Sequence, residues 1–451
     1  MSLTESRTES TRRKRWAGVL MSLSIIAAAC GTNQGGQASP GAEGTGTGGT
    51  SPGAASPDTA SPGGGAASGE LTAWAMGNEG VLLGDFVDGY TEDNPDAQVD
   101  VTPIDWTIAR DRLLTAIGGN QTPDVSQMGT DMMGEFIETG ALAPLPAGTD
   151  GGRFFEGAFN TGVTADGTAY SVPWYVETRV LYYRTDIAEA AGITEPPADW
   201  DELKAMAVAM QEEGGAEWGI GLSPANWQEY LPFLWSNGGD VMTDGEFALN
   251  SPAAVEALEF YDSFFEEGLS PNQVPEGFDI TPAFVQGTHP MFFSGPWHLG
   301  LIAEAGAEAG GEGFEENWAI APMPSAPGGD TGISFVGGGN LVVYTDSENP
   351  DLAWDFVEWM TQPETQLAWY EEATVLPSDR SAWDDSALAD DPNVQVFGDQ
   401  LENTRAQPAI ATWAEIAAAI NDQMEQVTVG DLDAQSGAEA MQQEAQSIGT
   451  E

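Results

Sequence analysis

Residues 71–128 read LTAWAMGNEGVLLGDFVDGYTEDNPDAQVDVTPIDWTIARDRLLTAIGGNQTPDVSQM, and this stretch decides the fold class. Three short runs in it are rich in residues that favour β-strands, at 71–74, 97–101 and 123–128. Between these runs, the segment after Gly77 and the segment 108–117 repeat apolar residues at helical spacing. A short alternation of strand, helix, strand and helix is typical of parallel strands joined by crossover helices. The sequence therefore predicts an α/β fold.

Longer amphipathic helices are predicted further along the chain, at 200–210, 252–267 and 351–360. Asp199 stands directly before the first of them, in the position of an N-cap. Ser251 has the same place before the second, which has Pro252 at its first helical position. The apolar stripes of these helices are broad, so we expect them to form the core and not a ligand surface.

The first 29 residues have the composition of a secretory signal peptide. A basic cluster at 12–15 precedes an apolar run at 16–29, which ends in three alanines before Cys30. The apolar run is shorter than the roughly 20 residues that a membrane-spanning helix requires. Cys30 is the only cysteine of the chain, so a disulfide within the chain and a thiolate metal cluster are both excluded.

Residues 30–69 are almost entirely Gly, Ala, Ser, Thr and Pro. Such a segment contains too little apolar side chain to offset the loss of chain entropy on folding, so it is predicted to be a flexible linker. The roughly 380 residues that follow are too many for a single hydrophobic core. We therefore expect them to form two lobes.

The charge of the chain restricts its partners. The sequence has 13 basic and 71 acidic residues, which give a net charge of −58. A surface this negative repels nucleic acid and anionic lipid headgroups, so neither is an expected partner. The same charge disfavours an anionic ligand.

One run of sequence resembles a known family. Residues 172–184 read VPWYVETRVLYYR, and the pattern continues through AGI at 191–193 to PADWDEL at 197–203. Other segments fit the same family in the same order: PDV at 123–125 with GALAPL at 140–145, SGPW at 294–297, PMP at 322–324 before FVGGGN at 335–340, AWDF at 353–356 with LPSDR at 376–380, and Arg405 with Pro408 and Trp413. Together they resemble the carbohydrate-specific extracellular solute-binding proteins, the family of maltose- and trehalose-binding proteins.

The resemblance implies two α/β lobes joined by three crossings of the chain, with a sugar bound in the cleft between them. By analogy, the first lobe comprises 70–178 plus 325–377 and the second comprises 179–324 plus 378–451. The implied function is the substrate-binding component of a carbohydrate ABC importer. A di- or oligosaccharide is the expected ligand, the permease subunits are the expected partners, and the protein is expected to be a monomer without a cofactor.

The end of the signal peptide resembles the lipobox of bacterial lipoproteins. Residues 27–31 read AAACG, with Ala27 where leucine is usual. In such proteins the cysteine is acylated and becomes the new N-terminus. The resemblance therefore implies a lipid on Cys30 and a place at the outer face of the cell membrane.

Four candidate ligand-binding residues lie in the predicted first lobe. Asn78 and Glu79 follow the first predicted strand, where the loops of α/β sheets usually meet a ligand. Trp106 and Asp131 are further candidates for the cleft. Carboxylate and amide groups suit the hydroxyls of a neutral sugar, and an aromatic plane suits its C–H face.

The resemblance adds candidates near the hinge and in the second lobe. Tyr175 and Glu177 lie where the hinge loop of the family reaches the ligand; Glu177 is expected either to bind ligand or to pair with Arg179, because burying it alone would be costly. Trp297 resembles the stacking tryptophan of the family, and Trp227 stands where relatives often have an aromatic residue.

The last candidates come from a glycine-rich run and from Arg380, one of the few basic residues of the chain. Gly338, Gly339 and Asn340 resemble a cleft loop of the family, and glycines allow the backbone to approach a ligand closely. No lysine follows the run, so it does not fit a phosphate loop. Arg380 stands where the family often has an arginine that bonds sugar hydroxyls; the alternative is an ion pair at the surface.

Three alternative functions are a glycoside hydrolase, a metalloenzyme, and a sugar sensor or adhesin. A glycoside hydrolase could use a carboxylate pair such as Glu79 and Glu177, but 71 acidic residues make such pairs common by chance and no hydrolase motif accompanies them. A metalloenzyme is disfavoured because His289 and His298 lack the spacing of helical metal ligands, so no metal is expected. A sugar sensor or adhesin with the same binding domain stays open.

Overall fold

The computed structural model describes residues 67–450 except 276, 312 and 330. The predicted signal peptide, Cys30 and nearly all of the predicted linker lie outside the described residues. The first strand begins at Ser68, so the last two residues of the predicted linker, 68 and 69, belong to it. Within the described part of the chain, no helix combines the length and the apolar character needed to cross a bilayer.

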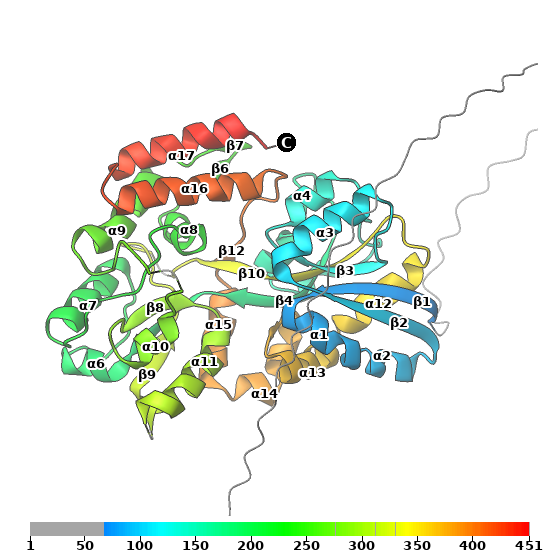
Figure 1. Ribbon diagram of the computed structural model, residues 1–451, viewed down its shortest axis with the longest axis horizontal. Helices are drawn as coiled ribbons and strands as arrows, with labels where there is room; N and C mark the ends of the chain where they lie inside the picture. Colours follow the sequence, from blue (N-terminus) through cyan, green and yellow to red (C-terminus); the bar gives the residue numbers. More distant parts are fainter. Residues whose placement is uncertain (1–66, 276, 312, 330, 451) are drawn as a thin grey trace, which may run out of the picture. The chain divides into compact units, whose positions relative to one another are not determined.

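A seven-stranded sheet forms the centre of the first lobe (Figure 1). Its strands are β1 (Ser68–Met76), β2 (Asp96–Ile104), β3 (Val125–Gly129), β4 (Val172–Thr178), β10 (Ser334–Val343), β11 (Leu376–Pro377) and β12 (Thr404–Arg405). The order is β11-β4-β10-β3-β1-β2, with β12 paired to β10. The predicted strands at 71–74, 97–101 and 123–128 are β1, β2 and β3, and they are parallel as expected. The sheet as a whole is mixed, because β10 arrives from much later in the chain and runs antiparallel to β3 and β4.

Helices cover this sheet. They are α1 (Gly77–Phe86), α2 (Asp88–Asp93), α3 (Trp106–Gly118), α4 (Met133–Glu138), α5 (Glu156–Asn160), α12 (Pro350–Met360) and α13 (Pro363–Ala373). The start of α3 is fixed by Asp105, whose carboxylate accepts a hydrogen bond from the Thr107 N–H at 2.8 Å. Trp106 is therefore the first helical residue, directly after β2.

The second lobe is built around an antiparallel sheet of β8 (Met291–Ser294), β5 (Val180–Arg184) and β9 (Trp318–Ala321), in that order. A short hairpin of β6 (Met242–Thr243) and β7 (Glu246–Phe247) lies apart from it. The surrounding helices are α6 (Thr185–Ala190), α7 (Trp200–Glu212), α8 (Trp227–Ser236), α9 (Pro252–Glu266), α10 (Ile280–Val285), α11 (Trp297–Ala305), α14 (Ser386–Ala389), α15 (Pro392–Leu401), α16 (Trp413–Thr428) and α17 (Ala434–Ile448). In Figure 1, α16 and α17 run side by side along this lobe.

The predicted caps of the long helices are confirmed. The Asp199 carboxylate accepts a hydrogen bond from the Glu202 N–H at 2.9 Å, at the start of α7. Ser251 caps α9 in the same way, with Pro252 as its first residue. The apolar faces of α7, α8 and α9 share one buried cluster with α16 and α17. The apolar face of α12 lies in a second buried cluster, so all three predicted stripes, on α7, α9 and α12, are core.

The chain passes from one sheet to the other over a single residue. β4 ends at Thr178 and β5 begins at Val180, so that only Arg179 lies between them. Hydrogen bonds tie this passage to the start of β10: the Thr178 hydroxyl donates to the Phe335 carbonyl at 2.8 Å, and the Ser334 hydroxyl donates to the Arg179 carbonyl at 2.7 Å. The segment from β9 to β10 is a second passage between the sheets, and these hydrogen bonds join it to the first.

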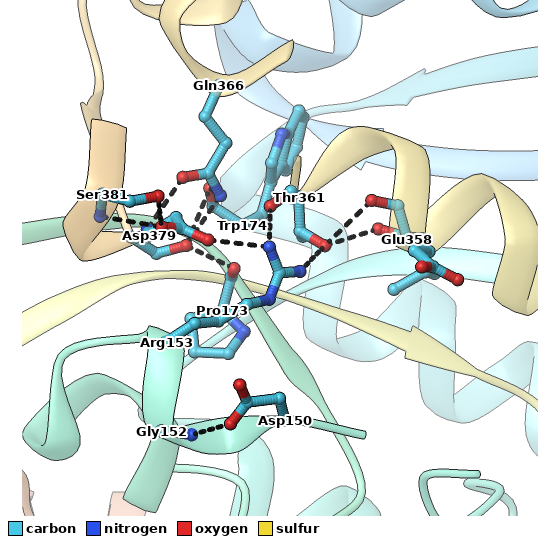
Figure 2. A network of polar contacts seen from close by, with 12 residues as sticks. Asp150, Gly152, Arg153, Pro173, Trp174, Glu358, Thr361, Gln366, Asp379 and Ser381 are labelled. Atoms are coloured by element: carbon cyan, nitrogen blue, oxygen red, sulfur yellow. Dashed lines mark hydrogen bonds and ion pairs between the residues drawn. The ribbon is translucent and has the colours of Figure 1, made fainter. Parts of the chain in front are cut away.

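A buried polar network supports the outer edge of β4 (Figure 2). The Arg153 guanidinium donates to the Asp379 carboxylate at 2.7 Å and to the Thr361 carbonyl at 2.6 Å. Gln366 on α13 donates to the Trp174 carbonyl at 2.8 Å and accepts from the Asp379 N–H at 2.9 Å. The network therefore connects the end of α12 and the first turn of α13 to strand β4 at Trp174, the residue before Tyr175.

Candidate functional site

A pocket of about 760 Å³ is lined by residues of the seven-stranded sheet, of the segments that follow its strands, and of helix α11 in the second lobe. Eight of the twelve predicted ligand-binding residues line it: Asn78, Glu79, Trp106, Asp131, Tyr175, Glu177, Trp297 and Gly338. The structure thus brings together most of the residues that the sequence singled out, although they are separated by more than 200 positions along the chain.

The first-lobe side of the pocket follows from the parallel strands. Asn78 and Glu79 lie in the first turn of α1 after β1, Trp106 begins α3 after β2, and Asp131 follows β3. The carboxyl ends of parallel strands meet at one edge of a sheet, which is where α/β folds usually bind ligands. The strand-end reasoning that selected Asn78 and Glu79 thus applies equally to Trp106 and Asp131, and all four residues line the same pocket.

Tyr175 and Glu177 come from β4, where residues two apart face the same side. The Tyr175 hydroxyl accepts a hydrogen bond from the Gln127 side chain at 3.0 Å. Burial raises the pKa of Tyr175 well above its ordinary value, and the nearby charges of Glu79 and Glu177 add to this. The phenol therefore stays protonated and can donate a hydrogen bond.

Two pocket carboxylates are shifted toward their neutral forms. Burial raises the pKa of Glu79 and of Asp131, and the charge of Glu177 raises both further. Glu177 itself has a partner, since its carboxylate lies 3.4 Å from the Arg179 guanidinium. The sequence offered ligand contact or pairing with Arg179 as alternatives for Glu177, and the structure shows a carboxylate that pairs with Arg179 and also lines the pocket.

Two indoles face the pocket from opposite lobes. Trp106 is 37% exposed and Trp297 is 38% exposed, which is unusual for the largest apolar side chain. Each ring lies against a glycine: a Cβ at Gly77 would come within 2.7 Å of Trp106, and one at Gly295 would overlap the ring of Trp297. Exposed, supported aromatic planes of this kind can stack on the flat face of a ligand.

The glycine run lies within strand β10 and not in the loop that the resemblance had implied. Gly338 has φ +126°, and a Cβ there would overlap the Tyr175 carbonyl. A Cβ at Gly337 would come within 2.7 Å of the Glu177 carboxylate. Gly337 and Gly338 line the pocket, but the close approach that requires glycine is to the neighbouring strand β4. The run therefore makes room for Tyr175 and Glu177.

Three of the predicted residues, Gly339, Asn340 and Arg380, do not line this pocket. Gly339 lies under the Tyr175 ring, and the buried Asn340 side chain donates to the Thr161 hydroxyl at 2.9 Å. Arg380 forms an ion pair with Glu402 at 2.6 Å, and each side chain is 49% exposed. The structure thus gives Arg380 the surface ion pair that was its alternative interpretation.

Trp227 lines a second, smaller pocket of about 310 Å³. Its ring packs edge-on against Trp413, with ring centroids 5.0 Å apart. Asp131 and Met132 line both pockets, so the two are neighbours. Arg110 borders the smaller one and is held by two hydrogen bonds to the Glu135 carboxylate, at 2.7 and 2.6 Å.

Sequence reasoning missed other pocket residues. Leu301 and Glu304 line the pocket together with Trp297, and the spacing of these three residues places them on one face of α11. That spacing could have identified them. Residues 373–375 at the end of α13 also line the pocket, and nothing in their local sequence indicates it.

The described residues contain no group of three or more His, Cys, Asp or Glu side chains placed to hold a metal ion. His289 and His298 border a different pocket from those above. His298 forms a short hydrogen bond of 2.7 Å with the Ser294 hydroxyl.

Comparison with known proteins gives a consistent result. The family model described as bacterial extracellular solute-binding protein matches residues 68–367. A putative binding protein of Brucella abortus is 27% identical over 350 residues, covering 76% of this chain and 83% of that protein. The maltodextrin-binding protein MdxE of Bacillus subtilis is 27% identical over 65% of this chain and 70% of that protein. The solved structure of the sugar-binding protein MalE from Xanthomonas citri has a TM-score of 0.79 at 29% identity, covering 84% of this chain and 97% of that one.

Proposed function

The chain belongs to the bacterial extracellular solute-binding protein family, and from this premise we propose that its solute is a neutral sugar, delivered to an ABC importer. The observation that carries the proposal is the pairing of two exposed indoles, Trp106 and Trp297, with the carboxylates of Glu79, Asp131 and Glu177 around one pocket. Aromatic planes match the C–H faces of a sugar ring, and carboxylates accept hydrogen bonds from its hydroxyls.

The charges around the pocket support a neutral ligand. The described residues that line it include Glu79, Asp131, Glu177 and Glu304 but no lysine, arginine or histidine. An anionic ligand would therefore enter a negative field, and the nearest arginines, Arg179 and Arg110, are already paired with Glu177 and Glu135. A sugar avoids this cost because its hydroxyls can donate to each carboxylate.

The neighbouring smaller pocket supports a ligand longer than one ring. Trp227 and Trp413 border it, and Asp131 and Met132 connect it to the larger pocket. A di- or oligosaccharide could occupy both. Relatives named maltotriose-binding protein, from Pyrococcus abyssi, and diacetylchitobiose binding protein, from Streptomyces coelicolor, fit a ligand of this length.

We further propose that the protein acts as a monomer whose lobes close on the sugar. A ligand that contacts both walls of the pocket favours the closed state, and permease subunits would recognise that state. The proposed lobes are 70–178 plus 325–377 and 179–324 plus 378–451, although β12, which belongs to the last of these segments, pairs with β10 in the sheet of the first lobe. The passages over Arg179 and at the start of β10 would then belong to the hinge.

A thermal-shift screen tests the proposed ligand. Purified protein is mixed with maltose, maltotriose, N,N′-diacetylchitobiose, single amino acids and peptides. A sugar at 100 times its dissociation constant should stabilise the folded state by about 2.7 kcal/mol and raise the melting temperature clearly. Stabilisation by amino acids or peptides alone would contradict the proposal, and consumption of the sugar during incubation would indicate a hydrolase.

We also propose that Cys30 carries a lipid that anchors the protein to the outer face of the membrane. The support is the sequence at 27–31 and the low-complexity linker that follows. Intact-mass analysis of protein extracted from membranes should show a chain that begins at Cys30 with added acyl mass. The Cys30→Ser variant should appear in the medium. An unmodified Cys30, or cleavage at another site, would refute the anchor.

A further inference from the structure

Arg179 has an unusual position in the molecule. It is the single residue between β4 and β5, and therefore lies where the chain passes from one sheet to the other. Its backbone is fixed on both sides, because its N–H donates to the Ser334 hydroxyl at 3.3 Å and its carbonyl accepts from the same hydroxyl at 2.7 Å. Its side chain is only 12% exposed, so the guanidinium is also held in place.

The guanidinium contacts one pocket residue from each lobe. Its Nη1 lies 3.4 Å from the Glu177 carboxylate on β4. Its central carbon lies 4.5 Å from the centre of the Trp297 ring at the start of α11. A third contact, to the Phe335 ring at 5.8 Å, lies on β10. A planar guanidinium is suited to this double role, since it can pair with a carboxylate and stack on an indole at once.

We propose that Arg179 is a positioning residue that holds the Trp297 indole and the Glu177 carboxylate as one sugar-recognition unit. The inference rests on the proposed function, because it assigns these two groups to the ligand. Arg179 covers one face of the indole and pairs with one oxygen of Glu177. Trp297 is 38% exposed and the Glu177 side chain is 27% exposed, so both groups can also contact a ligand in the pocket that they line.

The pairing of Arg179 with Glu177 restricts the kind of ligand that suits this part of the pocket. Arg179 offsets the negative charge of Glu177, so the carboxylate acts as a hydrogen-bond acceptor and attracts cations less. A sugar ring presents an apolar face beside a donating hydroxyl, which matches the pair. Neither Glu79 nor Asp131 forms an ion pair within the described residues, so this compensation is particular to Glu177.

The first experiment needs no ligand. The full chain is labelled with 5-fluorotryptophan, and the Trp297 resonance is assigned by its loss in Trp297→Phe. In Arg179→Met the ¹⁹F resonance of Trp297 should move and broaden, because the cation above the ring is gone. Arg380→Met is the matched control, since it removes an arginine from an exposed ion pair outside the pocket. An unchanged Trp297 resonance in Arg179→Met would overturn the proposal.

The second experiment measures affinity for maltotriose and N,N′-diacetylchitobiose by calorimetry. Arg179→Met should bind the preferred sugar about tenfold more weakly, a loss typical of a partly desolvated cation–π contact and its charge pair. Arg179→Lys should recover part of this affinity, because it keeps the charge but not the planar stack. In the Trp297→Ala background, Arg179→Met should cost less affinity than in the wild type, because only the pairing with Glu177 is then lost.

The outcomes separate this inference from the proposed function. If Trp297 responds to Arg179→Met but the wild type binds no sugar, the proposed function fails while the positioning of the ring stands. If the wild type binds sugar and Arg179→Met binds it equally well, Arg179 is a structural residue of the hinge and the inference is wrong. If Arg179→Lys and Arg179→Met lost the same affinity, the proposed role of the charge pair with Glu177 would be wrong, because lysine keeps the positive charge.

Discussion

Replacing Arg153 with methionine is expected to lower the free energy of unfolding by about 3 kcal/mol, because Arg153 is the partner of a buried carboxylate although its own side chain is 28% exposed. The substitution would leave the Asp379 carboxylate uncompensated, and Asp379 is only 1% exposed. It would also remove the donors to the Thr361 carbonyl and hydroxyl, at 2.6 and 2.7 Å. Methionine keeps most of the side-chain volume, so the loss reports on the polar contacts.

Arg380→Met provides the matched control. The Arg380–Glu402 pair has nearly the same length as the Arg153–Asp379 pair, 2.6 Å against 2.7 Å, but both of its side chains are 49% exposed. An exposed pair typically contributes about 0–1 kcal/mol. Urea unfolding at neutral pH should therefore distinguish the two variants clearly. Equal losses would show that the Arg153 network does not depend on burial.

The network matters for the pocket because of where it ends. Gln366 connects Asp379 to the Trp174 carbonyl, one residue before Tyr175. Hydrogen bonds from Gln366 on α13 and from Arg153, which binds the end of α12, therefore support the strand β4 that carries Tyr175 and Glu177. Precise binding sites generally need such support behind the residues that contact the ligand.

The pattern of the sequence predicted the fold class and much of the pocket, because both depend on local rules. Alternating strands and helices require parallel strands, and parallel strands bring their carboxyl ends together. Asn78, Glu79, Trp106 and Asp131 were identified on that basis or by the resemblance, and all four line the pocket. The second-lobe residue Trp297 was identified by the resemblance alone, since no local rule places it opposite Trp106.

Other features depend on contacts between distant segments, and the sequence could not show them. The mixed character of the sheet follows from β10, which enters between β3 and β4 from about 160 residues later in the chain. The glycines at 337–339 were interpreted as a ligand-facing loop, but the neighbouring strand is what requires them. The stacking of Arg179 on Trp297 joins residues more than 100 positions apart.

Trp297→Ala is expected to weaken binding of the preferred sugar by about 30-fold or more, because truncating a central tryptophan in a binding site costs about 2 kcal/mol or more. Stability should change much less, since the ring is 38% exposed and fills no part of the core. Calorimetric titration gives the affinity, and thermal unfolding without ligand gives the stability.

Phe278→Ala is the control for this variant. Phe278 is 39% exposed, nearly the same as Trp297, but it borders a different pocket and none of the proposed cleft. If both substitutions weakened binding equally, the loss would reflect a general effect of removing an exposed aromatic ring. If neither did, the sugar would not stack on Trp297, and the hydrogen-bonding wall of Glu79, Asp131 and Glu177 would have to account for recognition. A loss confined to Trp297→Ala would place the sugar ring against α11, in the same pocket as the strand ends that the sequence identified.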